Sequence, residues 1–109
     1  MISLIEEKRA ELNALCKTYD VQQLDLFGSA VNGTFHLASS DLDFIVSFRE
    51  PENRGYAKRY YYFAESLETL FRRKVDLLTE PMIGDPDFRD TIERTRQNIY
   101  EQRSEQTTA

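Results

Sequence analysis

Three acidic side chains stand where they could bind a metal ion. Asp41 and Asp43 lie two residues apart at the start of an apolar run, and Asp76 lies inside a second apolar run. Residues two apart on a strand project from the same face, so Asp41 and Asp43 would lie side by side. Carboxylate oxygens at this spacing suit Mg²⁺, which binds one or two carboxylates together with substrate phosphates. The simpler interpretations are solvated turn acids for the pair and a water-facing edge-strand acid for Asp76.

A glycine-serine pair, Gly28 and Ser29, follows another short apolar run and is expected to form a tight turn. Glycine lets the backbone approach a ligand closely. The free N–H groups of a following helical turn, together with the serine hydroxyl, could bind a phosphate. With the three acids, this turn completes a set that could surround two metal ions about 4 Å apart, across the attacking and leaving oxygens of an in-line displacement.

Hydrophobic periodicity predicts the elements that must position these residues. The predicted strands cover Leu24–Phe27, Leu42–Phe48 and Lys74–Thr79. The predicted helices cover Ser3–Tyr19, Tyr56–Leu70 and Asp87–Glu101, with a helical turn over Ser29–Asn32 and a helix start at Asp85 and Pro86. This alternation of helices and strands indicates an α/β or α+β domain with a small central sheet.

Two sets of apolar residues are expected to pack in the core rather than to bind a ligand. The aromatic stripe of the second long helix lies on one helical face, which favours core packing over stacking on a nucleobase. Its members are Tyr56, Tyr60, Phe63, Leu67 and Leu70. Cys16 is expected to be a small core residue on the inner face of the first helix.

The composition indicates one acidic domain. The 109 residues suit a single domain, predicted over 1–103, with 104–109 as a frayed polar tail. The net charge of −5 disfavours a nucleic-acid substrate, which usually requires a basic stripe. One cysteine excludes an internal disulfide, and no apolar run is long enough to span a membrane, so a cytoplasmic protein is expected.

The motifs together resemble the DNA polymerase β nucleotidyltransferase superfamily, and most closely its stand-alone minimal nucleotidyltransferase (MNT) branch. The matching segments are Gly28-Ser29, Gly33, Ser40–Val46 and Val75–Leu78. The resemblance implies a small mixed sheet flanked by helices, as in the polymerase β-type nucleotidyltransferase fold. It also implies ATP as the nucleotide donor and two Mg²⁺ ions as cofactors.

The resemblance assigns a role to each matching residue. Gly28 and Ser29 would hold the nucleotide triphosphate. Asp41 and Asp43 would bind both metal ions, and Asp76 would bind the metal that activates the attacking hydroxyl. These three acids are therefore the expected catalytic and metal-binding residues.

The same resemblance implies a protein partner. MNT proteins typically act as antitoxins of HEPN-domain toxins, by transferring AMP to a tyrosine of the toxin. Many members carry an arginine where this chain has Asn32, and this departure motivates an alternative, an antitoxin that neutralises its partner by contact alone. A third alternative is an antibiotic-type small-molecule nucleotidyltransferase that works as a homodimer.

Two further polar features have open interpretations. His36, the only histidine, is better explained as a surface loop residue than as a nucleotide contact. The basic cluster Arg72–Lys74 could contact a phosphate or an acidic partner, or it could be a solvated charge run at a helix end.

Overall fold

Four strands form one mixed sheet in a computed structural model that describes residues 3–28, 31, 41–51 and 54–102. The strands are β1 (Val21–Phe27), β2 (Leu42–Phe48), β3 (Val75–Leu78) and β4 (Gln97–Glu101), arranged in the order β3-β2-β1-β4. Strand β1 pairs antiparallel with β2 and with β4, whereas β2 and β3 are parallel. The mixed sheet flanked by helices confirms the expected fold class.

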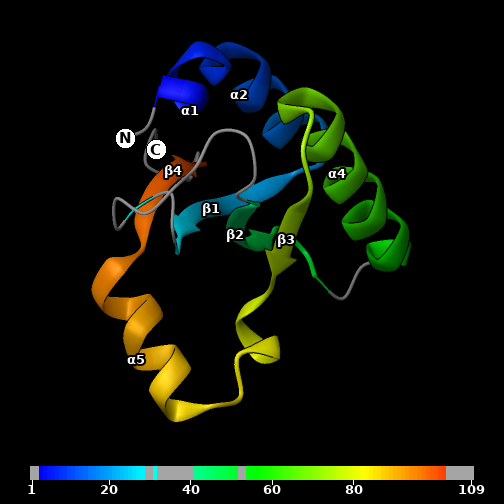
Figure 1. The fold of residues 1–109 in the computed structure, drawn as a ribbon. Helices are drawn as coiled ribbons and strands as arrows, with labels where there is room; N and C mark the ends of the chain where they lie inside the picture. The colour runs from blue at the N-terminus through cyan, green and yellow to red at the C-terminus, as the bar shows by residue number, and fades with distance from the viewer. Residues whose placement is uncertain (1–2, 29–30, 32–40, 52–53, 103–109) are drawn as a thin grey trace, which may run out of the picture.

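Helices cover both faces of the sheet (Figure 1). They are α1 (Ser3–Glu7), α2 (Arg9–Thr18), α4 (Tyr56–Phe71) and α5 (Pro86–Thr95), with a 3₁₀ turn η1 (Glu80–Met82) before α5. Helices α1, α2 and α4 gather on one side of the sheet, and α5 lies on the other side. None of the helices in the described ranges is both long and apolar enough to cross a membrane.

The larger core lies between the sheet and helices α1, α2 and α4. Alternate residues of β2 share one face of the strand and are all buried in this core, namely Leu42, Phe44, Val46 and Phe48. From α4, Phe63 and Leu67 are buried and Tyr56, Tyr60 and Leu70 pack against them, so the aromatic stripe is core as predicted. Cys16 is also fully buried, and this burial raises the pKa of its thiol to about 12.

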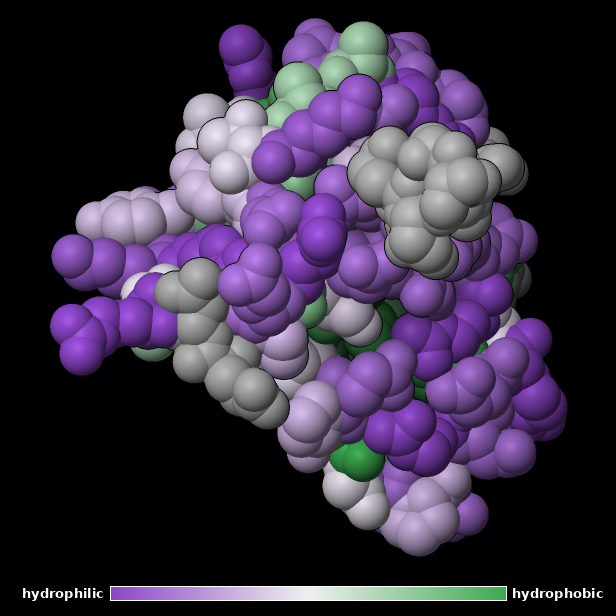
Figure 2. Space-filling view, turned by 180° about the vertical axis from the view of Figure 1, so that it is seen from behind, coloured by the Kyte–Doolittle hydropathy of each residue, from purple (hydrophilic) through white to green (hydrophobic). Residues whose placement is uncertain are grey.

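A smaller apolar cluster covers the opposite face of the sheet, beneath α5. It consists of Phe27, Ile45, Ile83 and Ile92. Ile45 lies two residues after Asp43 and therefore on the same face of β2, and only 2% of it is exposed. The face that carries the candidate acids is therefore itself partly covered. Viewed from the back, hydrophilic residues make up most of the surface, and hydrophobic ones show mainly within a recess (Figure 2).

The predicted first and last helices differ from the observed elements. The range Ser3–Tyr19 is helical but is divided at Lys8 into α1 and α2. The prediction of a helix over Asp87–Glu101 is wrong, because α5 ends at Thr95 and the chain continues as β4. Asp85 does begin α5, since its side chain accepts a hydrogen bond from the N–H of Phe88 at 2.8 Å.

The change from helix to strand occurs at Arg96, whose φ of −63° and ψ of 143° are extended. Beyond it, β4 supplies hydrogen-bond partners to the edge of β1, which would otherwise carry unpaired backbone groups. Ile99 had been counted as the next turn of the helix, but it is buried in the larger core as a strand residue. Local periodicity could not distinguish these outcomes, because the partner strand is distant in sequence.

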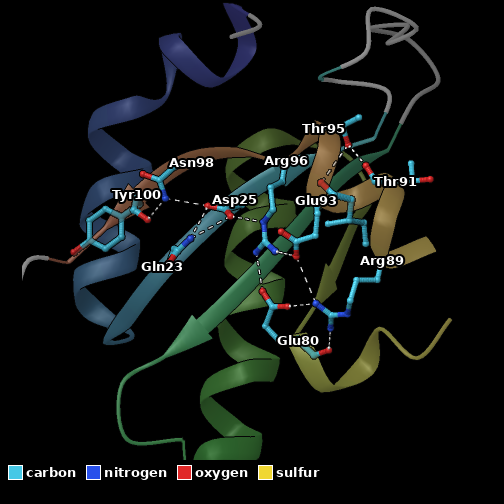
Figure 3. A network of polar contacts seen from close by, with 11 residues as sticks. Gln23, Asp25, Glu80, Arg89, Thr91, Glu93, Thr95, Arg96, Asn98 and Tyr100 are labelled. Carbon is cyan, nitrogen blue, oxygen red and sulfur yellow. Dashed lines mark hydrogen bonds and ion pairs between the residues drawn. The ribbon is translucent and has the colours of Figure 1, made fainter. Parts of the chain in front are cut away.

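Arg96 also anchors a polar network beneath α5 (Figure 3). Its Nε donates to Oδ2 of Asp25 at 2.7 Å, and the Asp25 side chain is only 4% exposed. Asn98 donates to the other oxygen of Asp25 at 2.9 Å, and Gln23 donates to both at 3.2 Å. The buried carboxylate on β1 therefore has both a cation and neutral donors, as a buried charge requires.

The same guanidinium reaches η1 and α5. It donates to Glu80 Oε2 and to Glu93 Oε2, each at 2.8 Å. Arg89 donates to Glu80 Oε1 at 3.1 Å. Burial alone would raise the pKa of Glu80, but the hydrogen bonds from Arg96 and Arg89 outweigh it and lower that pKa. One arginine thus joins β1, β4, η1 and α5.

Side chains also cover the two edges of the sheet. On the β3 edge, Glu68 accepts from the Val75 N–H at 3.1 Å, and the Tyr60 hydroxyl donates to the Leu77 carbonyl. On the β4 edge, Arg9 donates to the Ile99 carbonyl at 2.6 Å. These contacts occupy backbone groups that could otherwise pair with another strand.

Replacing Arg96 with methionine should lower the free energy of unfolding by about 3 kcal/mol, because the buried Asp25 carboxylate loses its cation. The matched control is Arg94→Met in the last turn of α5. Arg94 pairs with Asp90, and their side chains are 68% and 71% exposed. The control should cost less than about 0.5 kcal/mol. Urea unfolding at neutral pH measures both values, and equal losses would contradict a structural role for the buried pair.

Candidate active site

The parallel pairing of β2 and β3 places Asp43 directly beside Asp76. A parallel pair needs a crossover connection, and α4 supplies it. Because the two residues are register partners, their side chains project from the same face of the sheet. Asp76 is exposed on the edge strand, as expected for a water-facing edge-strand acid. It also adjoins the half-buried Asp43. The structure thus brings together two acids that are 33 positions apart in the numbering of the chain.

Gly28 completes this arrangement at the end of β1. Its neighbour Phe27 is the register partner of Asp43, so the turn begins beside that carboxylate. Gly28 has a φ of 79°, in the region that favours glycine, and a Cβ added there would overlap an oxygen of Asp43. Glycine is therefore required twice, by the turn and by the close approach to the acid. The carbonyl of Gly28 accepts a hydrogen bond from Val31 N–H at 3.0 Å.

Several predicted features lie outside the described residues. They are Ser29, Asn32, Gly33, His36, the tail 104–109 and, apart from Val31, the helical turn at 29–32. The serine hydroxyl as a phosphate donor stays a prediction.

The carboxylates repel one another in the absence of a cation. The pKa of Asp43 is raised to about 6, first by burial and then by a hydrogen bond with Asp76 and by the charges of Asp76 and Asp41. Asp41 itself is exposed and immediately precedes β2. Within the described ranges, no three acidic, histidine or cysteine side chains gather closely enough to hold one metal ion. The close pair is therefore Asp43 and Asp76, with Asp41 acting on it through its charge.

This pair fits a magnesium ion by the chemistry of its donors. Mg²⁺ takes oxygen ligands, needs only one or two carboxylates, and completes its coordination with water and substrate phosphates. Two carboxylates held in register, one of them with a raised pKa, form a site that a divalent cation would stabilise. Asp41 would join as a further ligand if its side chain turned toward Asp43.

The acids open into a cavity of about 530 Å³ between the sheet and α5. Gly28, Asp43 and Asp76 line its polar part, and Phe27 and Leu78 lie beside them. The opposite wall comes from α5 and consists of Phe88, Thr91 and Thr95. These three residues were not predicted from the sequence to belong to the site. Their spacing of three and four does place them on one helical face, but only the fold shows that this face looks onto the acids.

The basic cluster Arg72–Lys74 immediately precedes β3, the strand that carries Asp76. The Leu42 N–H donates to the Lys74 carbonyl at 3.2 Å, which brings Lys74 next to the start of β2. Arg72 ends α4 in the left-handed conformation, with a φ of 54°. The cluster therefore adjoins the acidic site, and its contact with a phosphate or an acidic partner stays a prediction.

Residues 8–99 match the sequence signature of the family described as nucleotidyltransferase domain. The chain belongs to this family. The protein is therefore a nucleotidyltransferase, and the matched region contains Gly28, Asp43 and Asp76. A protein of Methanocaldococcus jannaschii, named as a candidate protein adenylyltransferase, is 35% identical to this nucleotidyltransferase over 75 residues. The aligned region covers 69% of this chain and 73% of that protein.

Solved structures show the same fold. A candidate minimal nucleotidyltransferase is 25% identical, with a TM-score of 0.68, and the match covers 85% of this nucleotidyltransferase and 90% of that chain. A toxin–antitoxin complex with AMP-PNP has a TM-score of 0.63 at 19% identity, covering 91% and 76%. A Shewanella oneidensis complex of a tri-AMPylated HEPN toxin with its MNT antitoxin has a TM-score of 0.59 at 14% identity, covering 94% and 76%. The last two likenesses concern the fold alone.

Replacing Gly28 with alanine should damage the site more than the same change at Gly55. Both glycines have a positive φ, 79° and 92°, so both variants carry a backbone penalty of about 1 kcal/mol. A Cβ at Gly55 meets open space, whereas one at Gly28 displaces Asp43. We expect Gly28→Ala to lose about 1 kcal/mol more in urea unfolding and to bind Mg²⁺ more weakly. Equal behaviour of the two variants would show that the contact with Asp43 is unimportant.

Replacing Asp43 with asparagine should stabilise the metal-free protein at neutral pH. The folded-state pKa of about 6 lies above the ordinary 3.8, so the folded protein holds the proton more tightly than the unfolded chain does. The stability that Asp43 contributes is fully present below pH 3.8 and is lost as the pH rises through about 6. In wild type, Mg²⁺ should raise the Tm, and Asp43→Asn should abolish that rise.

Thermal unfolding with and without Mg²⁺ measures both effects. Asp90→Asn on the exposed side of α5 is the control, and it should keep the wild-type response to Mg²⁺. An Asp43→Asn variant less stable than wild type without metal would contradict the repulsion between the acids.

Proposed function

We propose that this nucleotidyltransferase transfers AMP from ATP to a tyrosine hydroxyl of a HEPN-domain toxin and thereby acts as its antitoxin. The observation that carries the proposal is the pairing of Asp43 with Asp76 beside the Gly28 turn, inside an open cavity. The relatives support a HEPN toxin as the acceptor of AMP. They include a candidate protein adenylyltransferase and an MNT antitoxin in complex with an AMPylated HEPN toxin.

Each residue of the site has a part in this reaction. The backbone at Gly28, with Ser29, binds the triphosphate, and Asp43 and Asp76, joined by Asp41, hold two Mg²⁺ ions. The bound Mg²⁺ neutralises charge on the phosphates and lowers the pKa of the attacking hydroxyl.

The proposed reaction is an in-line displacement at the α-phosphorus of ATP. The tyrosine oxygen forms a bond to this phosphorus, while the bond to the bridging oxygen of pyrophosphate breaks and pyrophosphate leaves. Asp76, on the exposed edge strand, lies on the side open to the acceptor and takes up the hydroxyl proton. The exposed edge suits an acceptor that arrives on another protein.

The alternative of an antitoxin that acts by contact rests on Asn32, where many MNT proteins carry an arginine. The alternative of a small-molecule nucleotidyltransferase would need an acceptor pocket shared between two copies of the chain. The net charge of −5 disfavours a nucleic acid as the acceptor. It is compatible with a protein partner, either as the acceptor of AMP or as a toxin neutralised by contact.

The Asp43→Asn variant separates these functions in a toxin co-expression assay. We expect it to bind the toxin but to lose neutralisation, and the toxin should lack the added AMP mass seen with wild type. The loss of AMP transfer should be at least about a hundred-fold, because a ligand to the reacting centre is removed. Asp90→Asn is the matched control and should keep both activities.

Three outcomes decide among the proposals. Full neutralisation by Asp43→Asn with an unmodified toxin would establish contact as the mechanism. Transfer of AMP to an added amino sugar by the purified protein alone would instead support the small-molecule function. An AMP-bearing toxin that appears only with a functional Asp43 would support the proposed one.

A further inference from the structure

The cavity beside the acids has two chemically different parts. Its polar part contains Gly28, Asp43 and Asp76, which suit phosphates and a divalent cation. Its other part is formed by the rings of Phe27 and Phe88, the side chain of Leu78, and the threonines of α5. A ligand that fills the cavity would therefore present phosphates to the acids and their cation, and an apolar, planar group to these rings. A nucleoside triphosphate has this distribution.

The aromatic wall begins directly at the phosphate turn. Phe27 precedes Gly28 in the chain, and its ring meets that of Phe88 edge-on, with the centroids 6.1 Å apart and an interplanar angle of 69°. Phe88 remains 42% exposed and lines this cavity. An exposed ring on the wall of a cavity offers a surface on which a nucleobase can stack. Since the base is joined to the phosphates, it is the planar group closest to this wall.

The two threonines limit which edge of a base can face α5. Thr91 Oγ1 donates its hydrogen to the Asp87 carbonyl at 3.1 Å, and Thr95 Oγ1 donates to the Thr91 carbonyl at 2.8 Å. With their hydrogens used inside the helix, these hydroxyl oxygens offer only lone pairs to the cavity. They can accept from an amine, but they have no hydrogen left for a carbonyl oxygen.

We propose that Phe88, Thr91 and Thr95 form a nucleobase subsite that selects adenine through its exocyclic amine. The inference rests on the proposed function in one respect, that the donor is a nucleoside triphosphate. Phe88 stacks on the base, and Thr91 or Thr95 accepts a hydrogen bond from the amine. Hypoxanthine has a carbonyl oxygen in place of that amine. This oxygen would face the threonine hydroxyl oxygens, and no hydrogen bond could form because both groups are acceptors.

The test compares the binding of three ligands by calorimetry, each with Mg²⁺ and without an acceptor. The ligands are ATP, ITP, which carries hypoxanthine, and inorganic tripolyphosphate, which lacks base and ribose. Wild type should bind ATP roughly ten-fold more tightly than ITP. It should also bind ATP at least about ten-fold more tightly than tripolyphosphate.

Two variants on α5 test whether the preference for ATP comes from Phe88, Thr91 and Thr95. Phe88→Ala should lose at least about ten-fold in ATP affinity while its affinity for tripolyphosphate stays unchanged. Thr91→Val, made together with Thr95→Val, should bind ATP and ITP equally. Retained binding of tripolyphosphate shows that each variant is folded, and Arg94→Met on the solvent side of α5 is the control, with wild-type affinities expected throughout.

Other outcomes overturn the inference in distinguishable ways. Equal affinities of wild type for ATP and tripolyphosphate, or an undiminished preference for ATP in Phe88→Ala, would remove the subsite and leave the transfer function standing. A Phe88→Ala variant with full ATP affinity but no AMP transfer would assign the wall to the acceptor instead. Wild type that binds neither ATP nor tripolyphosphate would overturn the proposed function together with the subsite.

Discussion

The buried pair of Arg96 and Asp25 is the interaction on which the second face of the sheet depends. Asp25 lies on a central strand, where an unpaired carboxylate would be costly, and Arg96 lies at the point where α5 becomes β4. By reaching Asp25, Glu80 and Glu93 together, the guanidinium joins the C-terminal end of α5 and the η1 turn to the sheet. The wall of the cavity opposite the acids is therefore held by one cation, although that cation is not part of the cavity itself.

The acidic site and its scaffold place opposite demands on the fold. Asp43 is half-buried beside a second acid and has a raised pKa, so ionisation of the pair costs stability, and a bound cation would offset that cost. The burial of two layers of apolar residues, one on each face of the sheet, offsets this loss of stability. Gly28 allows the turn to approach Asp43 without displacing its carboxylate, which a Cβ at this position would overlap.

Much of this protein could be inferred from local patterns, and the exceptions have a common cause. The strand β2, the apolar stripe of α4 and the start of α5 at Asp85 were all predicted, because each depends on residues that are close together in the sequence. The strand β4 was predicted as helix because Phe88, Ile92, Thr95 and Ile99 keep a helical spacing across Arg96. The free edge of β1 and the buried Asp25 override that spacing, and neither is visible in the local sequence.

The sequence by itself determined the chemistry available to this protein. Its motifs placed it in the nucleotidyltransferase family, because glycine turns and paired carboxylates depend on residue type and close spacing. The candidate site residues that they named are Gly28, Ser29, Asp41, Asp43 and Asp76. The tertiary structure alone decided which acids meet, through the parallel register of β2 and β3. It also decided that Phe88, Thr91 and Thr95 face them, because the packing of α5 on the sheet depends on contacts between residues far apart in the chain.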